Sequence, residues 1–475
     1  MVTLVFGILM TRVLSGHFSV HDYGTYSQVM LVTTTVSSLT ILGMMDGINF
    51  FFCREEDENK RNAYISTIFL LQYVVSAIAA TVILLCTVPL SRYFNNSDLK
   101  SLIIFAAILP VLSNSISMLQ ILFIAFGKAR IIAIRNLVVS ILKLIAIIIA
   151  SYVFDNIGFL LLYQAAMDFA QVLYFRYTLS KNNCHIHVFQ FDKSLIGEIF
   201  TYCIPMAMFT VIKSINRDCD KFVISFFADT ETLAIYTNAS KLLPFDIIMS
   251  SFCTVLLPYF TRYIVARKYD LTQNLYRSFL ELSYICTSIL AVGAIFTAPQ
   301  LMEFLYTEKY LSGLPIFIIY TLVDVVSVLN LTMLLSAAGK TKTIMYASLG
   351  TFIANIVLNI LCYLAFGLIG PAAATLIVTL VQGLIILYLS SREIKTSILK
   401  LFDWKYFSGF VVELIFMGIA VLAIRSKLEY LHLHYFLILC LCYGLFIGLL
   451  LLVNLKRIMS NVQAINSYKI SNFNS

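Results

Sequence analysis

Charged residues that could bind an anion lie at 213–221, in the segment Lys-Ser-Ile-Asn-Arg-Asp-Cys-Asp-Lys. This segment sets five charges inside an apolar run that begins near Leu195 and resumes at 222–227. A charge at the centre of a bilayer costs about 2.5–3.5 kcal/mol, whereas a good apolar residue returns only about 0.3–0.6 kcal/mol. The five charges therefore cannot all face lipid, and we expect them to face protein or water.

A spacing of i, i+3, i+4, i+7 and i+8 predicts one helical stripe, made of Lys213, Asn216, Arg217, Asp220 and Lys221. Asp218 is expected to point away from its centre. We expect Asp220 to neutralise Arg217 three residues before it, which leaves the stripe net positive. Such a stripe at membrane depth indicates a hydrated cavity for an anionic ligand. The alternative is that Asp220 and Lys221 lie at the outer interface, where long side chains reach water.

Arg217 is the first candidate for binding a phosphate or an acidic sugar, because its planar fork can make two parallel hydrogen bonds to an anion. The alternative is a structural ion pair with Asp220. Lys213 has no acid one helical turn away on the stripe, which favours contact with a ligand. These two cations are the core of the predicted binding site.

Three further cations are candidates for the same cavity. Lys143 lies in the middle of an apolar run, and Asp168 in the next run is a plausible structural partner. Arg12 borders the first apolar run and is otherwise a snorkelling anchor. Lys241 is five residues from Asp246, which is poor pairing geometry on a helix and leaves Lys241 able to reach the cavity.

Two lone carboxylates, Asp46 and Asp324, also lie inside apolar runs. A buried carboxyl group can hold a proton, so either residue could carry one through a transport cycle. The alternative is a hydrogen-bonded core residue. Asp220 and Asp168 complete the predicted set of coupling or ion-pair acids.

The composition is that of a membrane protein. Of 475 residues, 60% are hydrophobic and only 12% are charged, against about 25% in soluble domains. The net charge of +8 does not indicate nucleic-acid binding, because the cations are distributed among short connections and form no basic patch with interleaved aromatics. The sequence predicts an all-α integral membrane protein.

No motif predicts catalysis, a metal or a cofactor. The ten cysteines include no CxxC pair, and most lie inside apolar runs. The His185-x-His187 and His432-x-His434 pairs lack further ligands nearby. Glycine loops of the ATP-binding type are missing. We expect a protein that is not an enzyme and that draws on an ion gradient, with H⁺ or Na⁺ as the coupling ion, or on consumption of its substrate at the far side.

Apolar runs of about 20 residues predict fourteen spans. They cover roughly 1–13, 26–52, 64–88, 102–126, 131–154, 159–179, 195–227, 234–260, 278–298, 313–338, 343–366, 369–389, 407–424 and 435–453. The first is too short to cross the membrane, which favours a truncated or late-assigned start over a signal peptide.

The distribution of cations among the connections between these spans predicts the topology. The even-numbered connections, together with the C-terminus, carry 22 Lys and Arg residues, whereas the odd-numbered connections and their borders carry 6. Cytoplasmic loops hold the excess of cations, so both termini are predicted to be cytoplasmic.

An internal repeat relates the two halves of the chain. The matched pairs are 125–130 with 337–342 and Gly158 with Gly370 at an offset of 212, and 22–26 with 232–236 at an offset of 210. We therefore predict six-helix bundles at 1–190 and 191–395, followed by two additional helices and a tail at 396–475. Six is an even number, so the bundles are related by a pseudo-two-fold axis along the membrane normal.

Several short stretches that contain small residues and turn glycines are distributed over nearly the whole chain. They are Thr11-Arg12-Val-Leu-Ser15 with Asp22-Tyr23-Gly24-Thr-Tyr26, Asp220-Lys221-Phe-Val-Ile with Ala234-Ile235-Tyr236 and Leu257-Pro258, and Gly339-Lys340 with Asn355-Ile-Val-Leu-Asn359 and Phe366-Gly367-Leu-Ile-Gly370. In order and spacing these stretches resemble the polysaccharide flippase family. That family belongs to the multidrug/oligosaccharidyl-lipid/polysaccharide exporter superfamily.

The resemblance implies a fold like that of multidrug and toxic-compound extrusion (MATE) proteins. It also implies a bacterial inner-membrane flippase that moves undecaprenyl-pyrophosphate-linked oligosaccharide outward for O-antigen, capsule or exopolysaccharide assembly. A polysaccharide polymerase and chain-length proteins would be its partners. The cations fit this function independently, since a pyrophosphate needs positive charge in a water-filled space.

Two other functions compete with this interpretation. A MATE-like ion-coupled antiporter of small cationic drugs would prefer an acidic, aromatic cavity, whereas the 213–221 stripe carries more cations than acids. A membrane-embedded glycosyltransferase or polymerase would be expected to carry a substantial loop outside the membrane. No predicted connection here greatly exceeds about 20 residues.

Overall fold

The computed structural model describes residues 2–126, 128–154, 156–181, 191–241, 243, 245 and 247–470. All regular secondary structure in these ranges is helical, which confirms the predicted all-α class. Contacts divide the chain into two compact units that meet at Thr237 and Asn238. We call them unit 1 and unit 2. The predicted boundary at residue 190 was derived from the internal repeat. The contacts do not test that repeat, so this boundary stays a prediction.

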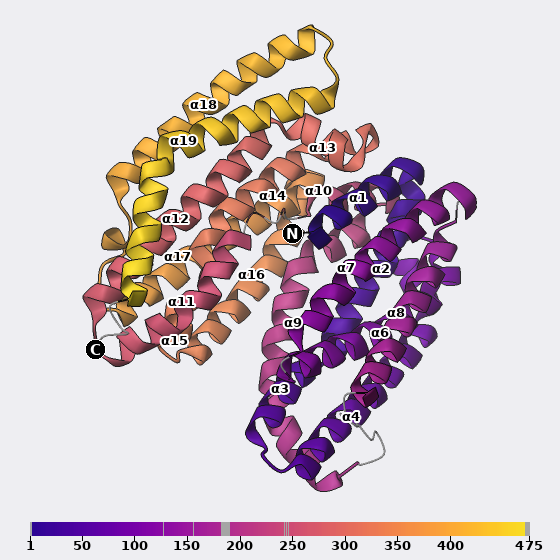
Figure 1. Cartoon of the computed structure of the whole chain (residues 1–475). Helices are drawn as coiled ribbons and strands as arrows, with labels where there is room; N and C mark the ends of the chain where they lie inside the picture. The colour runs from indigo at the N-terminus through magenta and orange to yellow at the C-terminus, as the bar shows by residue number, and fades with distance from the viewer. Residues whose placement is uncertain are drawn as a thin grey trace. The chain divides into compact units, whose positions relative to one another are not determined.

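Unit 1 is a helical bundle, drawn from indigo to magenta in Figure 1. Its helices are α1 (Val2–His17), α2 (Val20–Thr40), α3 (Met44–Arg54), α4 (Glu58–Leu85), α5 (Thr87–Tyr93), α6 (Leu99–Ala125), α7 (Ala129–Ile149), α8 (Ile157–Lys181), α9 (Ile196–Phe227) and α10 (Thr230–Ala239), with the short turns η1 (Ala150–Phe154) and η2 (Lys193–Leu195). Helix α6 packs against α2, α3, α4 and α8, and α9 packs against α2 and α3. One core forms where α3, α4, α6, α8 and α9 meet, with Phe51, Leu119 and Phe175 among its buried members.

The predicted span 26–52 is not one straight helix. Helix α2 ends at Thr40, α3 begins at Met44, and their axes differ by 41°. Leu42 and Gly43 between them have positive φ angles of 44° and 66°. Glycine adopts this region without steric cost, so Gly43 allows the turn that redirects α3.

Unit 2 is a second helical bundle, drawn from pink through orange to yellow in Figure 1. Its elements are α11 (Ile247–Val265), α12 (Tyr269–Phe296), α13 (Ala298–Tyr306), η4 (Glu308–Gly313), α14 (Leu314–Ser327), η5 (Val328–Asn330), α15 (Met333–Ala337), α16 (Thr341–Phe366), η6 (Gly367–Ile369), α17 (Gly370–Glu393), η7 (Ile398–Leu401), α18 (Trp404–Tyr430) and α19 (Tyr435–Ile470). Helix α12 is central, since it packs against α11, α14, α18 and α19. The C-terminal helices α18 and α19 are therefore part of the packed unit.

Two further predicted spans are interrupted, one of which begins in unit 1 and continues into unit 2. The predicted span 234–260 is divided between α10 and α11, and Lys241 lies in the break. The predicted span 313–338 is divided into α14, the turn η5 and the short α15. Hydropathy alone does not reveal such breaks, because the intervening residues remain apolar on average.

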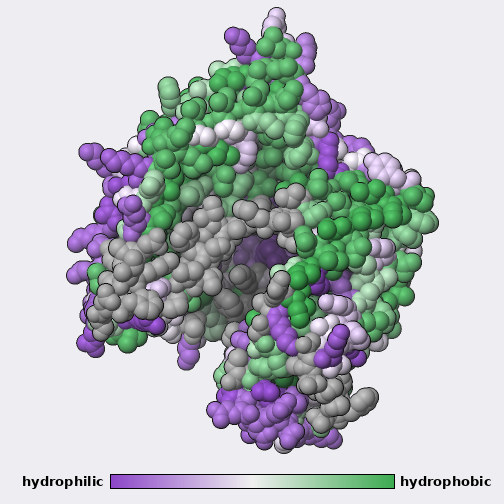
Figure 2. All heavy atoms as spheres, viewed as in Figure 1, coloured by the Kyte–Doolittle hydropathy of each residue, from purple (hydrophilic) through white to green (hydrophobic). Residues whose placement is uncertain are grey.

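The surface of the helices matches a membrane environment. Figure 2 shows hydrophobic residues covering α18 and α19, where Val412, Phe416 and Ile419 are exposed by 65%, 73% and 58%. Over the described ranges, nine segments are long and apolar enough to span a membrane, or ten if α2 and α3 form one span, and the segment 342–393 contains both α16 and α17. The protein is a multi-pass membrane protein, and the count of fourteen spans stays a prediction.

Candidate functional site

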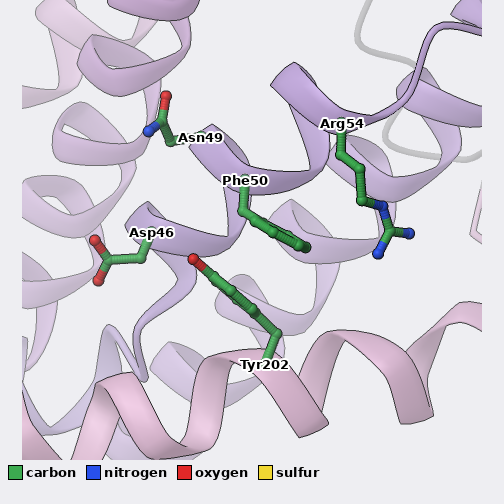
Figure 3. A pocket seen from close by; sticks show the side chains of 5 residues that line it. All are labelled: Asp46, Asn49, Phe50, Arg54 and Tyr202. Carbon is green, nitrogen blue, oxygen red and sulfur yellow. The ribbon is translucent and has the colours of Figure 1, made fainter. Parts of the chain in front are cut away.

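Unit 1 contains a pocket with a volume of about 400 Å³, near the lower end of the range for small-molecule sites. Figure 3 shows the five residues that line it, which are Asp46, Asn49, Phe50 and Arg54 of α3 and Tyr202 of α9. We call it the Asp46 pocket. Within it, sequence analysis singled out Asp46 alone as a candidate site residue.

Helix periodicity and one glycine place these side chains together. Asp46, Asn49, Phe50 and Arg54 follow i, i+3, i+4 and i+8, so they share one face of α3. On the packed side of α3, a Cβ atom at Gly47 would lie 2.6 Å from the Sγ atom of Cys203. The close approach of α3 to α9 at this glycine brings Tyr202 against Phe50.

Aromatic rings form the floor between α3 and α9. The Phe50 and Tyr202 rings stack with centroids 4.2 Å apart and an interplanar angle of 13°. Phe51 stacks on Tyr64 of α4 behind them, with centroids 4.5 Å apart. The Arg54 guanidinium lies 5.3 Å from the Phe50 centroid and 5.1 Å from that of Phe51. These contacts hold Phe50 and Arg54 in defined positions.

The pocket has an acidic balance. Arg54 Nη2 donates to Glu198 Oε1 at 2.6 Å, and the Tyr64 hydroxyl donates to the other oxygen of the same carboxylate. The charge of Arg54 is therefore largely compensated. Asp46 is exposed and makes no hydrogen bond or ion pair with any residue that the structure describes. The Asp46 pocket thus presents one uncompensated carboxylate beside an aromatic surface.

The cationic stretch lies further along α9, and Asp218, not the predicted Asp220, contacts Arg217. Arg217 Nε and Nη2 lie 3.4 and 3.2 Å from Asp218 Oδ2, and Nη2 also lies 3.5 Å from Ser214 Oγ. Lys221 Nζ donates to the second oxygen of Asp218 at 2.6 Å. The prediction that Asp220 neutralises Arg217 is wrong, because the long arginine side chain folds back to its neighbour.

One carboxylate is thus shared by two cations. The side chain of Arg217 remains 60% exposed, whereas that of Lys221 is only 18% exposed. Arg217 Nη1 makes no hydrogen bond or ion pair in the described part of the chain. Asp220 is buried and accepts a hydrogen bond from the Tyr236 hydroxyl at 2.9 Å. Lys213 lies on α9, but its side chain is outside the described residues.

A polar cluster inside unit 1 includes two of the predicted residues. Lys143 Nζ of α7 lies 3.5 Å from Asp168 Oδ1 of α8, which is the partner that the sequence suggested. Asp168 is buried and accepts a hydrogen bond from Gln171 Nε2 at 2.9 Å. Arg135 donates to Gln171 and lies 5.1 Å from the centroid of Phe175. Arg135 lies within α7.

In unit 2, Asp324 joins the two interrupted spans. Its Oδ2 atom accepts a hydrogen bond from the backbone N–H of Leu243, in the break between α10 and α11, at 3.2 Å. Lys241 is exposed in the same break. Asp324 itself is buried near the end of α14. Arg12 is a half-buried residue of α1.

The structure places the predicted residues in separate groups and not in one common site. Asp46 belongs to the pocket, Arg217 and Asp220 to α9, Lys143 and Asp168 to the polar cluster, and Lys241 and Asp324 to the interrupted helices. The described ranges contain no group of three or more His, Cys, Asp or Glu side chains able to hold a metal ion.

The aromatic and amide residues of the pocket were missed because their types are common in apolar runs. Asn49, Phe50 and Tyr202 carry no charge that would mark them in sequence. The i, i+3, i+4 spacing of polar and aromatic residues after Gly43 was the one available signal, and it gave no indication of the facing helix.

Comparisons with known proteins gave a family match and several structures of similar fold. Residues 9–315 match the model of a family described as polysaccharide biosynthesis protein. A search of curated proteins found no match.

Among solved structures, one titled as the lipid II flippase MurJ in an inward closed conformation is similar with a TM-score of 0.74 and 17% identity. The match covers 96% of this chain and 98% of that one. An inward-facing multidrug resistance MATE family transporter matches with a TM-score of 0.65 and 13% identity, over 83% and 94% of the two chains. A MOP superfamily transporter from Pyrococcus furiosus, described as having a binding pocket of reverse polarity, matches with a TM-score of 0.57 and 13% identity, over 83% and 92% of the two chains. At these identities the likeness establishes the fold.

Proposed function

The chain belongs to the polysaccharide biosynthesis protein family, and we propose that it is a flippase for polyprenyl-pyrophosphate-linked oligosaccharide in a bacterial cytoplasmic membrane. The fold shared with a lipid II flippase supports this proposal. The carried unit would supply surface polysaccharide synthesis, such as that of O-antigen, capsule or exopolysaccharide. No ATP-binding loop occurs in the sequence, which supports a transporter that is neither an enzyme nor an ATPase.

The observation that carries the proposal is the charge arrangement on α9. Asp218 contacts both Arg217 and Lys221. The Nη1 atom of Arg217 has no hydrogen-bond partner among the described residues and can bind a ligand. A diphosphate can form charge-assisted hydrogen bonds with this open side of the fork. Lys213 lies one helical turn before Arg217 and would add a second cation to the same anion.

We assign the remaining predicted residues to supporting roles. Lys143, Arg12 and Lys241 are further candidates for contact with the anionic headgroup, although Asp168 already pairs with Lys143. Asp46, Asp324, Asp168 and Asp220 are candidates for coupling to H⁺ or Na⁺ or for structural pairing, and the contacts of Asp168 and Asp324 favour the structural role. Alternating access would come from rocking of one bundle against the other.

The excess of Lys and Arg in alternate connections supports cytoplasmic termini. With this orientation, the carried unit would move outward to a polysaccharide polymerase and chain-length proteins. These partners are part of the proposal.

A drug antiporter is the second candidate, and one observation favours it. The uncompensated carboxylate of Asp46 beside the Phe50 and Tyr202 rings could hold a lipophilic cation. The MATE transporter with a similar fold is consistent with this alternative. The two functions differ in the charge of the cargo, so they can be separated by experiment.

A deletion strain tests the flippase proposal. We expect loss of the gene to make a lipid-linked oligosaccharide accumulate with its sugars inaccessible from outside the cell. Wild-type protein should relieve the accumulation, and a normally expressed Arg217→Ala variant should not. Absence of accumulation, together with hypersensitivity to cationic drugs, would favour the antiporter.

A further inference from the structure

The Asp46 pocket and the cations of α9 offer two different chemistries within unit 1. The pocket presents aromatic rings, an amide and an uncompensated carboxylate, whereas the 213–221 stretch presents cations. We propose that the Asp46 pocket binds a sugar residue of the carried glycan, while the diphosphate binds elsewhere. This inference rests on the proposed flippase function and assigns the recognition of the sugar to named residues.

The charge of the pocket excludes the diphosphate. Arg54 is bound by Glu198 at 2.6 Å, and Asp46 remains without a counter-charge among the described residues. An anion entering the pocket would meet the Asp46 carboxylate, which would repel it. A neutral hydroxyl group, in contrast, can donate a hydrogen bond to Asp46. Hydrogen bonds to charged acceptors are among the stronger ones in proteins.

The shape of the pocket suits a sugar ring. A pyranose has an apolar face made of C–H groups and an edge made of hydroxyls. The stacked rings of Phe50 and Tyr202 provide an apolar surface, and Figure 3 shows the Tyr202 hydroxyl directed toward Asp46. Asn49 places an amide group in the lining of the pocket. A few polar groups around an aromatic surface are typical of small-molecule sites.

The distance along α9 indicates that one substrate can use both regions. Tyr202 and Arg217 are 15 residues apart on the same helix, which corresponds to about 22 Å at 1.5 Å per residue. A single sugar phosphate could not contact both residues. An oligosaccharide attached to a diphosphate could, so we expect the pocket to hold a sugar that is distant from the diphosphate.

A binding experiment tests this inference without relying on transport. The full-length protein would be purified and placed in lipid nanodiscs, and the probes would be methyl glycosides of the monosaccharides found in the strain's surface polysaccharide. Saturation-transfer NMR would measure their binding to wild type and to the Asp46→Ala and Tyr202→Leu variants. The matched control is Tyr177→Leu, which changes an exposed tyrosine of α8 away from the pocket.

We expect wild type and Tyr177→Leu to bind at least one glycoside, and both pocket variants to bind it about tenfold more weakly or not at all. Asp46→Asn keeps an oxygen acceptor and should retain most of the binding. Size-exclusion chromatography establishes that each variant is folded. If a pocket variant does not fold, Phe50→Leu, which removes one ring of the stacked pair, provides the same comparison.

Three outcomes would overturn the inference. They are the absence of binding of any glycoside by wild type, unchanged binding by the pocket variants, and displacement of the glycoside by the cation tetraphenylphosphonium together with loss of binding in Asp46→Asn. Rescue of the deletion strain by wild type is measured in parallel. Failure of that rescue would reject the flippase function, whereas the binding data would still decide whether the pocket is a sugar site.

Discussion

At the scale of single residues, spacing predicted the directions of Cβ atoms on α9 but not the final ion pairs. Asp218 was placed away from the stripe, yet its carboxylate contacts both Arg217 and Lys221. Adjacent side chains on a helix do not face each other at Cβ. A long arginine can nevertheless fold back, and the sequence does not reveal its rotamer. For Lys143 and Asp168, whose partners lie on neighbouring helices, the suggested pair is present.

The Lys143–Asp168 pair should contribute to stability more than to transport. Removing Asp168 leaves the Lys143 ammonium without its partner, and because that side chain is 33% exposed the cost should stay below the roughly 3–5 kcal/mol of a fully buried charge. We therefore expect Asp168→Leu alone to lower the unfolding temperature markedly in nanodiscs. The double variant Lys143→Met with Asp168→Leu should recover much of that loss and keep transport activity. A stable double variant without transport would show instead that Lys143 acts on the substrate.

At the scale of elements, hydropathy located the apolar segments but not their interruptions. The turn between α2 and α3 depends on Leu42 and Gly43 with positive φ, and in the break after α10 the backbone N–H of Leu243 donates a hydrogen bond to the distant carboxylate of Asp324. Glycine in an apolar run is common, and a contact 81 residues away leaves no local pattern. The Asp46 pocket, where Tyr202 lies against α3, was not predicted as a site. Its geometry depends on the turn between α2 and α3, which sets the direction of α3.

Gly43 should be sensitive to a side chain. A non-glycine residue in the left-handed region costs about 1–2 kcal/mol, so Gly43→Ala should destabilise the protein. Gly409 is the matched control, because it lies inside α18 with open space around its Cβ position. There the same substitution should be neutral or stabilising by up to about 1 kcal/mol. Thermal unfolding of both variants measures the difference, and equal shifts would contradict the role given to Gly43.

Asp324 should act as an anchor for the break between α10 and α11. Asp324→Asn keeps an oxygen that can accept from the Leu243 N–H, whereas Asp324→Ala removes it and should cost about 1.5–3 kcal/mol. We expect the Asn variant to unfold at nearly the wild-type temperature and to retain transport. A stable Asn variant that no longer transports would identify Asp324 as a proton or cation carrier instead.

At the scale of the whole molecule, composition and motif order predicted the all-α membrane class and the family, because both depend on features repeated along the entire chain. No sequence pattern indicates that charged contacts attach α18 and α19, which lie outside the predicted repeat, to the rest of unit 2. Arg457 of α19 contacts Glu281 of α12 and lies 3.0 Å from Asp403, which caps α18. The three partners are 54 to 176 residues apart.

Arg457→Ala should loosen the attachment of the two C-terminal helices. Glu281 is buried, and loss of its partner would leave its charge uncompensated at a cost of about 3–5 kcal/mol. Lys456→Ala, which changes the exposed neighbouring residue, is the matched control and should have little effect. Unfolding in nanodiscs compares the two variants. Indistinguishable melting temperatures would show that the network adds little to stability.

Reconstitution of the purified protein tests the central claim most directly. Liposomes would carry a polyprenyl-pyrophosphate-linked oligosaccharide, and a membrane-impermeant glycosidase or lectin would report how much of it reaches the outer leaflet. We predict protein-dependent movement of the lipid that is lost in Arg217→Ala and retained in Tyr177→Leu. Movement that does not depend on the protein, or a protein that moves only cationic drugs, would contradict the flippase assignment.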